Sequence, residues 1–180
     1  MESFYNRGSI NLNNKEKLIQ DNYSKVNQIS AKCMRVIVAI LALAFVYCYF
    51  GTDMDESVLI VFFASAVFIA LIPTLIINIL KFDHAPVTKH IVIICVCLIA
   101  TMMLTLLSTY AYPIMLFPIL MASLYYNQTL VLFASLLMSC GIVGSNYFAY
   151  RFSDIFIGFP CESFEDAMMS YVVPQIVVVF

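Results

Sequence analysis

The stretch that decides the fold is PIMLFPILMASLYYNQTLVLFASLLMSCGIVGSNYFAYR, residues 113–151. It holds two apolar runs, 114–125 and 129–150, joined by the polar turn YNQ at 126–128. A helix as short as the first run rises about 18 Å, well below a hydrocarbon core of about 30 Å, whereas the second run is long enough to cross a bilayer. Pro118 also interrupts the first run. A short, proline-broken segment beside a full span is where membrane proteins tend to hold a pocket.

The composition places the whole chain in the membrane class. Of its 180 residues, 63% are hydrophobic and 11% are charged, and the mean hydropathy is +0.94. A soluble domain carries about 25% charged residues. No basic face is left once the cations that flank the apolar runs are accounted for, so we expect no nucleic-acid partner.

The apolar runs predict an all-α fold: a polytopic transmembrane helix bundle with five complete spans and the start of a sixth. Residues 1–32 are expected to be a cytoplasmic, amphipathic N-terminal segment, and residues 33–180 the transmembrane domain. The expected spans are 33–50, 57–80, 91–109, 113–126, 129–150 and 171–180. The last run is half a span long, so we expect the sixth crossing to continue beyond this sequence and to return to the cytoplasm.

The distribution of cations predicts the orientation. With the N-terminus in the cytoplasm, one side of the membrane collects eight of the nine cations and Arg151 alone lies outside. The eight are Arg7, Lys15, Lys17, Lys25, Lys32, Arg35, Lys81 and Lys89. This asymmetry follows the positive-inside rule and predicts a multi-pass protein of the cell membrane with a cytoplasmic N-terminus.

A seven-residue repeat marks the N-terminal segment. Leu12, Ile19, Val26 and Cys33 recur at this interval, which indicates a helix that runs into the first span and pairs with another helix, as in a homodimer. An amphipathic helix that lies on the inner leaflet explains the same residues equally well. Both interpretations stay open at this point.

Few residues in the sequence point to catalysis. No acidic, basic or histidine residue falls in the interior of a span, and His84 and His90 lie in a loop at a spacing that matches no metal-binding helix. None of the common nucleotide-binding, hydrolase or metalloprotease motifs occurs, and the six cysteines show no convincing metal-ligand spacing. We therefore expect no enzyme activity, no catalytic residue, no metal and no cofactor in this segment.

The candidate binding residues lie at the predicted outer ends of two spans. Asn146 would be costly in lipid without a partner, and an outer pocket around it would have one cation, several hydroxyls and apolar walls. The predicted ligand-binding residues are Tyr110, Tyr112, Asn146, Tyr147, Tyr150 and Arg151. The alternative, an ordinary aromatic belt with a snorkelling arginine, explains the same residues without a ligand.

One segment resembles a known class of proteins. Residues 118–127, PILMASLYYN, followed by Leu130 and a long apolar span, resemble the N-terminal multi-pass sensor regions of bacterial signalling proteins, chiefly diguanylate cyclases and sensor histidine kinases. The stretch from Phe159 through the acidic residues 162–166 to YVVPQ at 171–175 is similar to the start of the last span in such proteins. The resemblance implies a six-helix input domain ahead of a cytoplasmic output domain. No GGDEF motif or kinase residue is present to carry an output activity.

Two functions remain open from the sequence. The first is a membrane-embedded sensor and transducer that responds to a small or lipophilic ligand, or to the bilayer itself, and works as a homodimer. Prolines within or beside spans would let such a bundle bend between two states. The alternative is a small multi-pass transporter or channel subunit. A membrane-embedded enzyme is the weakest candidate, because the spans lack the ionisable groups it would need.

Overall fold

The computed structural model describes residues 2–51, 55–82, 85–107, 113–151 and 164–180, and this part of the chain contains helices and turns but no strand. The elements in chain order are α1 (Glu2–Gly51), α2 (Glu56–Thr74), the π-helix η1 (Leu75–Ile79), α3 (Thr88–Leu107), α4 (Leu116–Ser123), α5 (Gln128–Arg151), α6 (Phe164–Ala167), the π-helix η3 (Met168–Val172) and α7 (Val173–Val179). The predicted all-α fold class is confirmed.

Four of these stretches are long and apolar enough to cross a membrane. They are Lys17–Gly51, Glu56–Ile79, Thr88–Leu106 and Gln128–Arg151, and two shorter apolar helices, Pro113–Ser123 and Met168–Val179, accompany them. The run expected as the fourth span, 113–126, thus contains a helix too short to cross by itself. A complete fifth crossing and a cytoplasmic N-terminus stay predictions.

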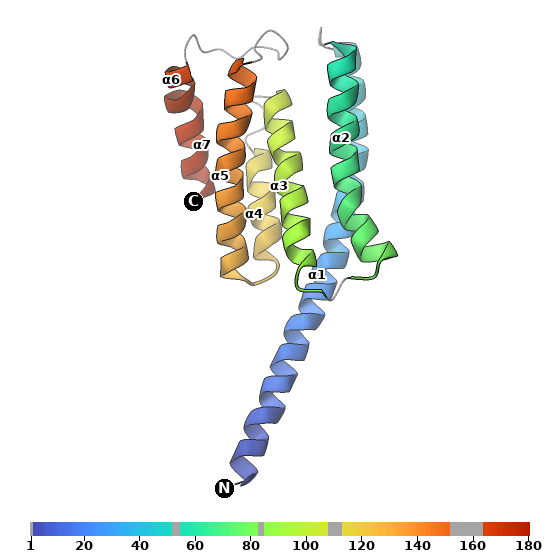
Figure 1. Ribbon diagram of the computed structural model, residues 1–180, viewed down its shortest axis with the longest axis vertical. Coiled ribbons are helices and arrows are strands. Elements are labelled where there is room, and N and C mark those ends of the chain that lie inside the picture. The colour runs from blue at the N-terminus through green and yellow to red at the C-terminus, as the bar shows by residue number, and fades with distance from the viewer. Residues whose placement is uncertain (1, 52–54, 83–84, 108–112, 152–163) are drawn as a thin grey trace.

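Helix α1 is continuous across the boundary at residue 32, where the sequence suggested a change from a surface segment to a span. From Ser9 to Phe50 the chain contains neither glycine nor proline, so nothing in this stretch breaks the helix. At 1.5 Å per residue its 50 residues extend over about 75 Å. Its N-terminal half therefore projects beyond the other helices as a rod (Figure 1).

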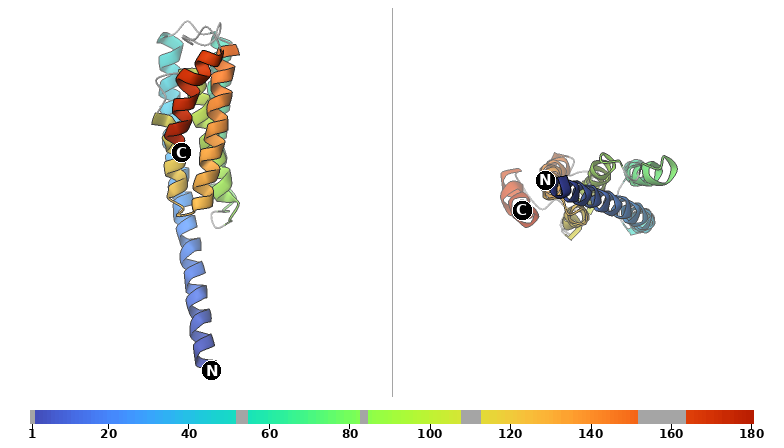
Figure 2. Two further views of the ribbon diagram at one scale, coloured as in Figure 1. Left: turned by 90° about the vertical axis from the view of Figure 1, so that its left-hand side faces the viewer. Right: turned by 90° about the horizontal axis from the view of Figure 1, so that it is seen from below.

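The other helices pack with the second half of α1 in two layers. Helices α2, α3 and α5 stand side by side in one layer, and α1 and α4 lie behind them, with α7 beside α5 at the edge (Figures 1 and 2). Helix α3 is the centre of the bundle, because 67% of the residues of its apolar stretch are buried, against 17–33% in the other three long helices. Helices α1 and α2 pack on one side of α3 and helices α4 and α5 on the other, and α7 packs against α5.

Helix α2 begins with a cap and ends at a distortion. The Asp55 carboxylate accepts hydrogen bonds from the amides of Ser57 (2.8 Å) and Val58 (3.4 Å), which satisfies two donors that the first turn leaves unpaired. Near the other end, Pro73 has no amide hydrogen to donate, and the following turn widens into η1. The helical stretch ends at Ile79, and Lys81, two residues later, has a left-handed φ of 54°.

Helices α4 and α5 form a hairpin about the polar turn that the sequence indicated. Tyr126 takes a left-handed φ of 49°, and the Asn127 side-chain oxygen accepts a hydrogen bond from the Leu130 amide at 3.2 Å, which caps α5. Further along α5, Gly141 lies directly against Thr101 of α3, so that an added Cβ would overlap the threonine hydroxyl. Gly141 therefore makes a close contact between α5 and α3, whereas Gly144 faces open space.

Candidate functional site

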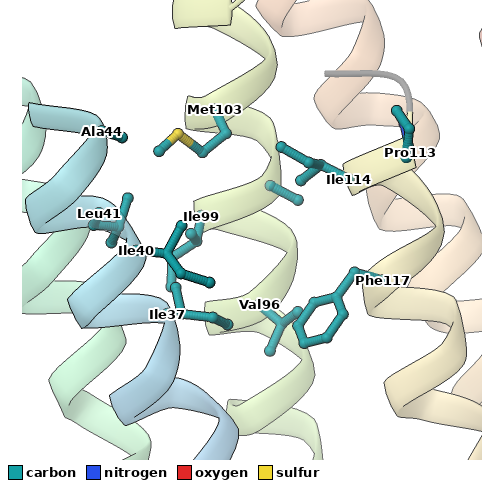
Figure 3. A pocket seen from close by; sticks show the side chains of 11 residues that line it. Ile37, Ile40, Leu41, Ala44, Val96, Ile99, Met103, Pro113, Ile114 and Phe117 are labelled. Atoms are coloured by element: carbon teal, nitrogen blue, oxygen red, sulfur yellow. The ribbon is translucent and has the colours of Figure 1, made fainter. Parts of the chain in front are cut away.

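A cleft of about 400 Å³ opens between α1, α3 and the start of α4. We call it the apolar cleft. Its lining residues are Ile37, Ile40, Leu41, Ala44, Val96, Ile99, Ala100, Met103, Pro113, Ile114 and Phe117, and Figure 3 shows their side chains facing the space from the three helical segments. Its volume lies within the range of about 300–1,000 Å³ that small-molecule pockets occupy.

The apolar cleft has a buried floor and an exposed rim. Leu41, Val96 and Ala100 are 1–2% exposed and form the floor, whereas Ile40 at the edge is 56% exposed and Pro113 is also exposed. The cleft is therefore open between α1 and α4, which form its side walls, and α3 lies beneath it.

The position of the cleft follows from the short segment that begins at Pro113. Residues 113–115 form a 3₁₀ turn and α4 begins only at Leu116, so this segment lies beside one part of α3 and not along its whole length (Figure 1). Helix α1 approaches α3 from the other side, and the cleft lies between the two. The sequence placed a pocket beside this short, proline-broken segment, but did not indicate that α1 supplies a wall.

The chemistry of the cleft is uniform. Every lining side chain is a hydrocarbon or a thioether, so the cleft offers no acid, base, nucleophile or hydrogen-bond donor. A ligand with a polar group inside it would lose hydration and gain no partner, at a cost of about 2–7 kcal/mol. The arrangement can bind an apolar molecule, and it cannot carry out acid–base or nucleophilic chemistry.

A second hollow, of about 570 Å³, lies at the α4–α5 turn and involves Tyr126 and Gln128. Although its volume is larger, most of its lining residues are exposed, and Tyr126 is 90% exposed. It is a depression in the surface without a buried floor. The apolar cleft is therefore the better candidate for a binding site.

The same helix α1 carries a polar cluster closer to its projecting half. The Tyr125 hydroxyl, from the α4–α5 turn, donates a hydrogen bond to Oδ1 of Asn27 at 2.7 Å. Both residues are almost fully buried, at 1% and 0% exposure. A phenol titrates near pH 10 in water, so this hydroxyl keeps its proton at neutral pH and remains a donor.

Lys89 of α3 completes this cluster. Its Nζ lies 4.3 Å from the ring centroid of Tyr23, which is cation–π distance, although the lysine is only 8% exposed. The rings of Tyr23 and Tyr125 lie 6.1 Å apart. We call these four residues, Tyr23, Asn27, Lys89 and Tyr125, the polar joint, because they connect α1 to α3 and to the α4–α5 turn at the level where α1 leaves the bundle.

The polar joint was not predicted from the sequence. Asn27 looked like one of several asparagines in a polar N-terminal segment, Lys89 like a loop cation, and Tyr125 like the end of an apolar run. Val26 and Cys33 of the seven-residue repeat pack into the same part of the bundle, while Ile19 is 41% exposed. Two of the four repeat residues thus pack against other helices of the same chain.

The predicted outer site is described only in part. Tyr110 and Tyr112 lie outside the described residues. Tyr147 and Arg151 are exposed and Tyr150 is half-buried, all near the end of α5.

Asn146, the centre of the predicted outer site, has partners within the chain. Its Nδ2 donates to the Ile142 carbonyl at 2.8 Å and to Oε1 of Gln175 at 3.3 Å. Gln175 is 4% exposed and belongs to α7. The Asn146 amide therefore connects α5 to α7 by a polar contact between two apolar helices.

The described part of the chain shows neither a metal-ligand cluster nor an unpaired buried polar side chain. It contains no group of three or more His, Cys, Asp or Glu side chains that could hold an ion. No buried side-chain nitrogen or oxygen in it lacks a hydrogen-bond partner.

The chain matches no protein-family model, no curated protein and no solved structure in the three comparisons made.

Proposed function

We propose that this domain is the membrane-embedded sensor and transducer of a bacterial signalling protein. It lies in the cell membrane with its N-terminus in the cytoplasm, and occupancy of the apolar cleft changes the position of α1, which passes the signal towards a cytoplasmic output domain. One observation carries the proposal. Helix α1 forms a wall of the cleft through Ile37 to Ala44 and continues without a break, past the polar joint, into the projecting rod.

The distribution of charge supports the proposed orientation. The projecting half of α1, the end of η1, the start of α3 and the α4–α5 turn all lie at one end of the bundle (Figure 1). That end carries Lys81, Lys89 and the lysines of α1, whereas Arg151 ends α5 at the opposite end. Cations concentrate on the cytoplasmic side of membrane proteins.

The packing supports a movement of α1 together with α2. These two helices share a core that includes Leu41, Leu59 and Phe63, and the rings of Phe45 and Phe63 meet edge to face at 5.4 Å. The apolar cleft separates part of this pair from α4. A molecule in the cleft would favour the arrangement in which α1 stands further from α4, and the difference in affinity between the two arrangements would set the size of the response.

The proposal can be tested without knowing the ligand, by filling the cleft with a side chain. Spin labels attached through Gln20→Cys, on the projecting half of α1, and Gln128→Cys, at the start of α5, report the distance between the rod and the bundle; both positions are exposed. The native cysteines are first replaced by alanine. Ala44→Phe then places an aromatic ring in the cleft, and we expect the distance distribution from pulsed electron resonance to shift.

The matched control is Ala42→Phe, two residues away on the exposed side of the same helix. It adds the same ring outside the cleft, so the distribution should stay as in the parent. If Ala44→Phe and Ala42→Phe both leave the distribution unchanged while the protein stays folded, occupancy of the cleft is not coupled to the rod and the transducer proposal is wrong.

A further inference from the structure

We infer that the apolar cleft is a binding site for a single hydrocarbon chain of a bilayer phospholipid, which enters sideways between α1 and α4. The inference deepens the proposed function and rests on it in one respect, namely that these helices lie in a bilayer. A phospholipid acyl chain is apolar along its length, thin and flexible, and it reaches the protein from the side.

The lining excludes ligands with a polar group inside the cleft. The side chains of all eleven lining residues consist of carbon, or of carbon and sulfur. Neither Thr101 nor Thr105 of α3 lines the cleft: Thr105 Oγ1 donates to the Thr101 carbonyl at 3.0 Å, and Thr101 lies against Gly141 of α5. The polar part of any occupant must stay outside the rim.

The mouth of the cleft faces the direction from which a lipid comes. Its exposed rim residue Ile40 belongs to an apolar outer surface of α1 that also includes Val36 and Leu43, which are 60% and 73% exposed. In a bilayer this surface contacts hydrocarbon. A lipid chain can therefore pass from the surface of α1 over the rim into the cleft without crossing a polar region.

The size of the cleft argues for a thin occupant. A cleft of about 400 Å³ lies near the lower end of the range of about 300–1,000 Å³ that small-molecule pockets occupy. A helix is about 10 Å across with its side chains, so a single acyl chain is the thinner occupant and the better match to a small cleft. Apolar cavities as small as about 150 Å³ stay dry and take up small hydrocarbons, because their walls otherwise lack dispersion contacts.

Tryptophan fluorescence offers a direct test, because the chain contains no tryptophan and any introduced one is a sole reporter. Phe117→Trp places the reporter in the wall of the cleft. Phe68→Trp places it on the outer face of α2, where the native ring is 66% exposed. Each variant is reconstituted into phosphatidylcholine vesicles with and without a fraction of phosphatidylcholine brominated midway along its acyl chains, since bromine quenches indole on contact.

We expect brominated lipid to quench both reporters, and only the cleft reporter to respond to filling of the cleft. Ala44→Phe added to Phe117→Trp should remove most of the quenching, whereas Ala42→Phe should leave it unchanged. Ile114→Phe fills the cleft from the other wall and serves as a second filling variant should Ala44→Phe fail to fold. Neither filling variant should alter quenching of the reporter at position 68.

Two results would overturn the inference. Absence of quenching at position 117, with normal quenching at position 68, would mean that no lipid chain enters; if quenching then appeared on dilution of the protein in lipid, a second copy of the chain would be the occupant. Equal quenching at position 117 with and without a filling variant would mean that the reporter senses only lipid around the protein. Quenching that depends on filling, combined with an unchanged spin-label distance in Ala44→Phe, would leave the lipid site intact and refute the transducer.

Discussion

Two stretches of one helix, α1, meet the rest of the bundle in opposite ways. At the polar joint, Asn27 is completely buried and bonded to Tyr125. About ten residues and ~15 Å further on, the side chains of Ile37, Ile40, Leu41 and Ala44 line the open apolar cleft. Breaking a buried hydrogen bond costs free energy, because a polar group is left without a partner. Side chains that line an open apolar cleft leave no polar group unpaired when they move apart, so we expect their separation to cost less. If α1 moves as proposed, we therefore expect the joint to be its fixed point and the cleft to be the place where the movement occurs.

The largest expected effect comes from breaking the fixed point. Asn27→Ala removes the oxygen that accepts the hydrogen bond of the buried Tyr125 hydroxyl at 2.7 Å, and we expect it to lower the free energy of unfolding by about 3 kcal/mol. Reversible unfolding in mixed detergent micelles, followed by circular dichroism, measures this loss. Gln20→Ala on the exposed projecting half of α1 is the control and should stay within about 0.5 kcal/mol of wild type. Equal stability of the two variants would show that the joint fixes nothing.

A smaller loss is expected where α3, which forms the floor of the cleft, is held against α5. Gly141→Ala forces a methyl group onto Thr101, and overpacking of this kind lowers stability by about 2 kcal/mol. Gly144→Ala, one helical turn along α5, meets nothing within 4 Å and should be neutral. Thermal midpoints of the two variants in detergent decide the matter. Should both be neutral, α3 and α5 do not form a rigid wall, and the cleft could open on that side as well.

The cation–π contact of the joint predicts a loss of about 1 kcal/mol. Tyr23→Leu removes the ring below the Lys89 ammonium, while Tyr23→Phe keeps it. We expect unfolding in micelles to show the loss in the leucine variant and near wild-type stability in the phenylalanine variant. If phenylalanine lowers the stability as much as leucine does, the phenol oxygen and not the ring is what matters at this position.

The smallest expected effect lies at the other edge of the bundle, where Asn146 and Gln175 join α5 to α7. Side-chain hydrogen bonds between membrane helices contribute about 0.6 kcal/mol on average. A double-mutant cycle with Asn146→Leu and Gln175→Leu should give a coupling energy of that size. A value near zero would mean that the contact does not hold α7, and a value above ~2 kcal/mol would make this edge a second fixed point comparable to the polar joint.

Several features of the fold were predictable because they depend on local sequence. The run expected at 57–80 appears as Glu56–Ile79 and the run expected at 129–150 as Gln128–Arg151, since apolar length alone determines where a spanning helix can form. The turn after Tyr125 was visible as a polar break. The sequence indicated a pocket between this short segment and the span at 129–150, whereas the apolar cleft is lined by α1, α3 and the start of α4.

Only the tertiary structure decided which faces of these helices meet. Helices such as α2 are apolar on all sides, so their periodicity does not indicate which residues point inwards. The Tyr125–Asn27 contact joins positions 98 residues apart, and the cleft combines Ile37 with Phe117 from opposite sides of α3. In a chain this rich in apolar residues, the sequence by itself determined that helices of spanning length form and where they turn. How they rotate and pack, and hence where a polar group finds its partner or a cleft stays open, depended on contacts between residues distant in the chain.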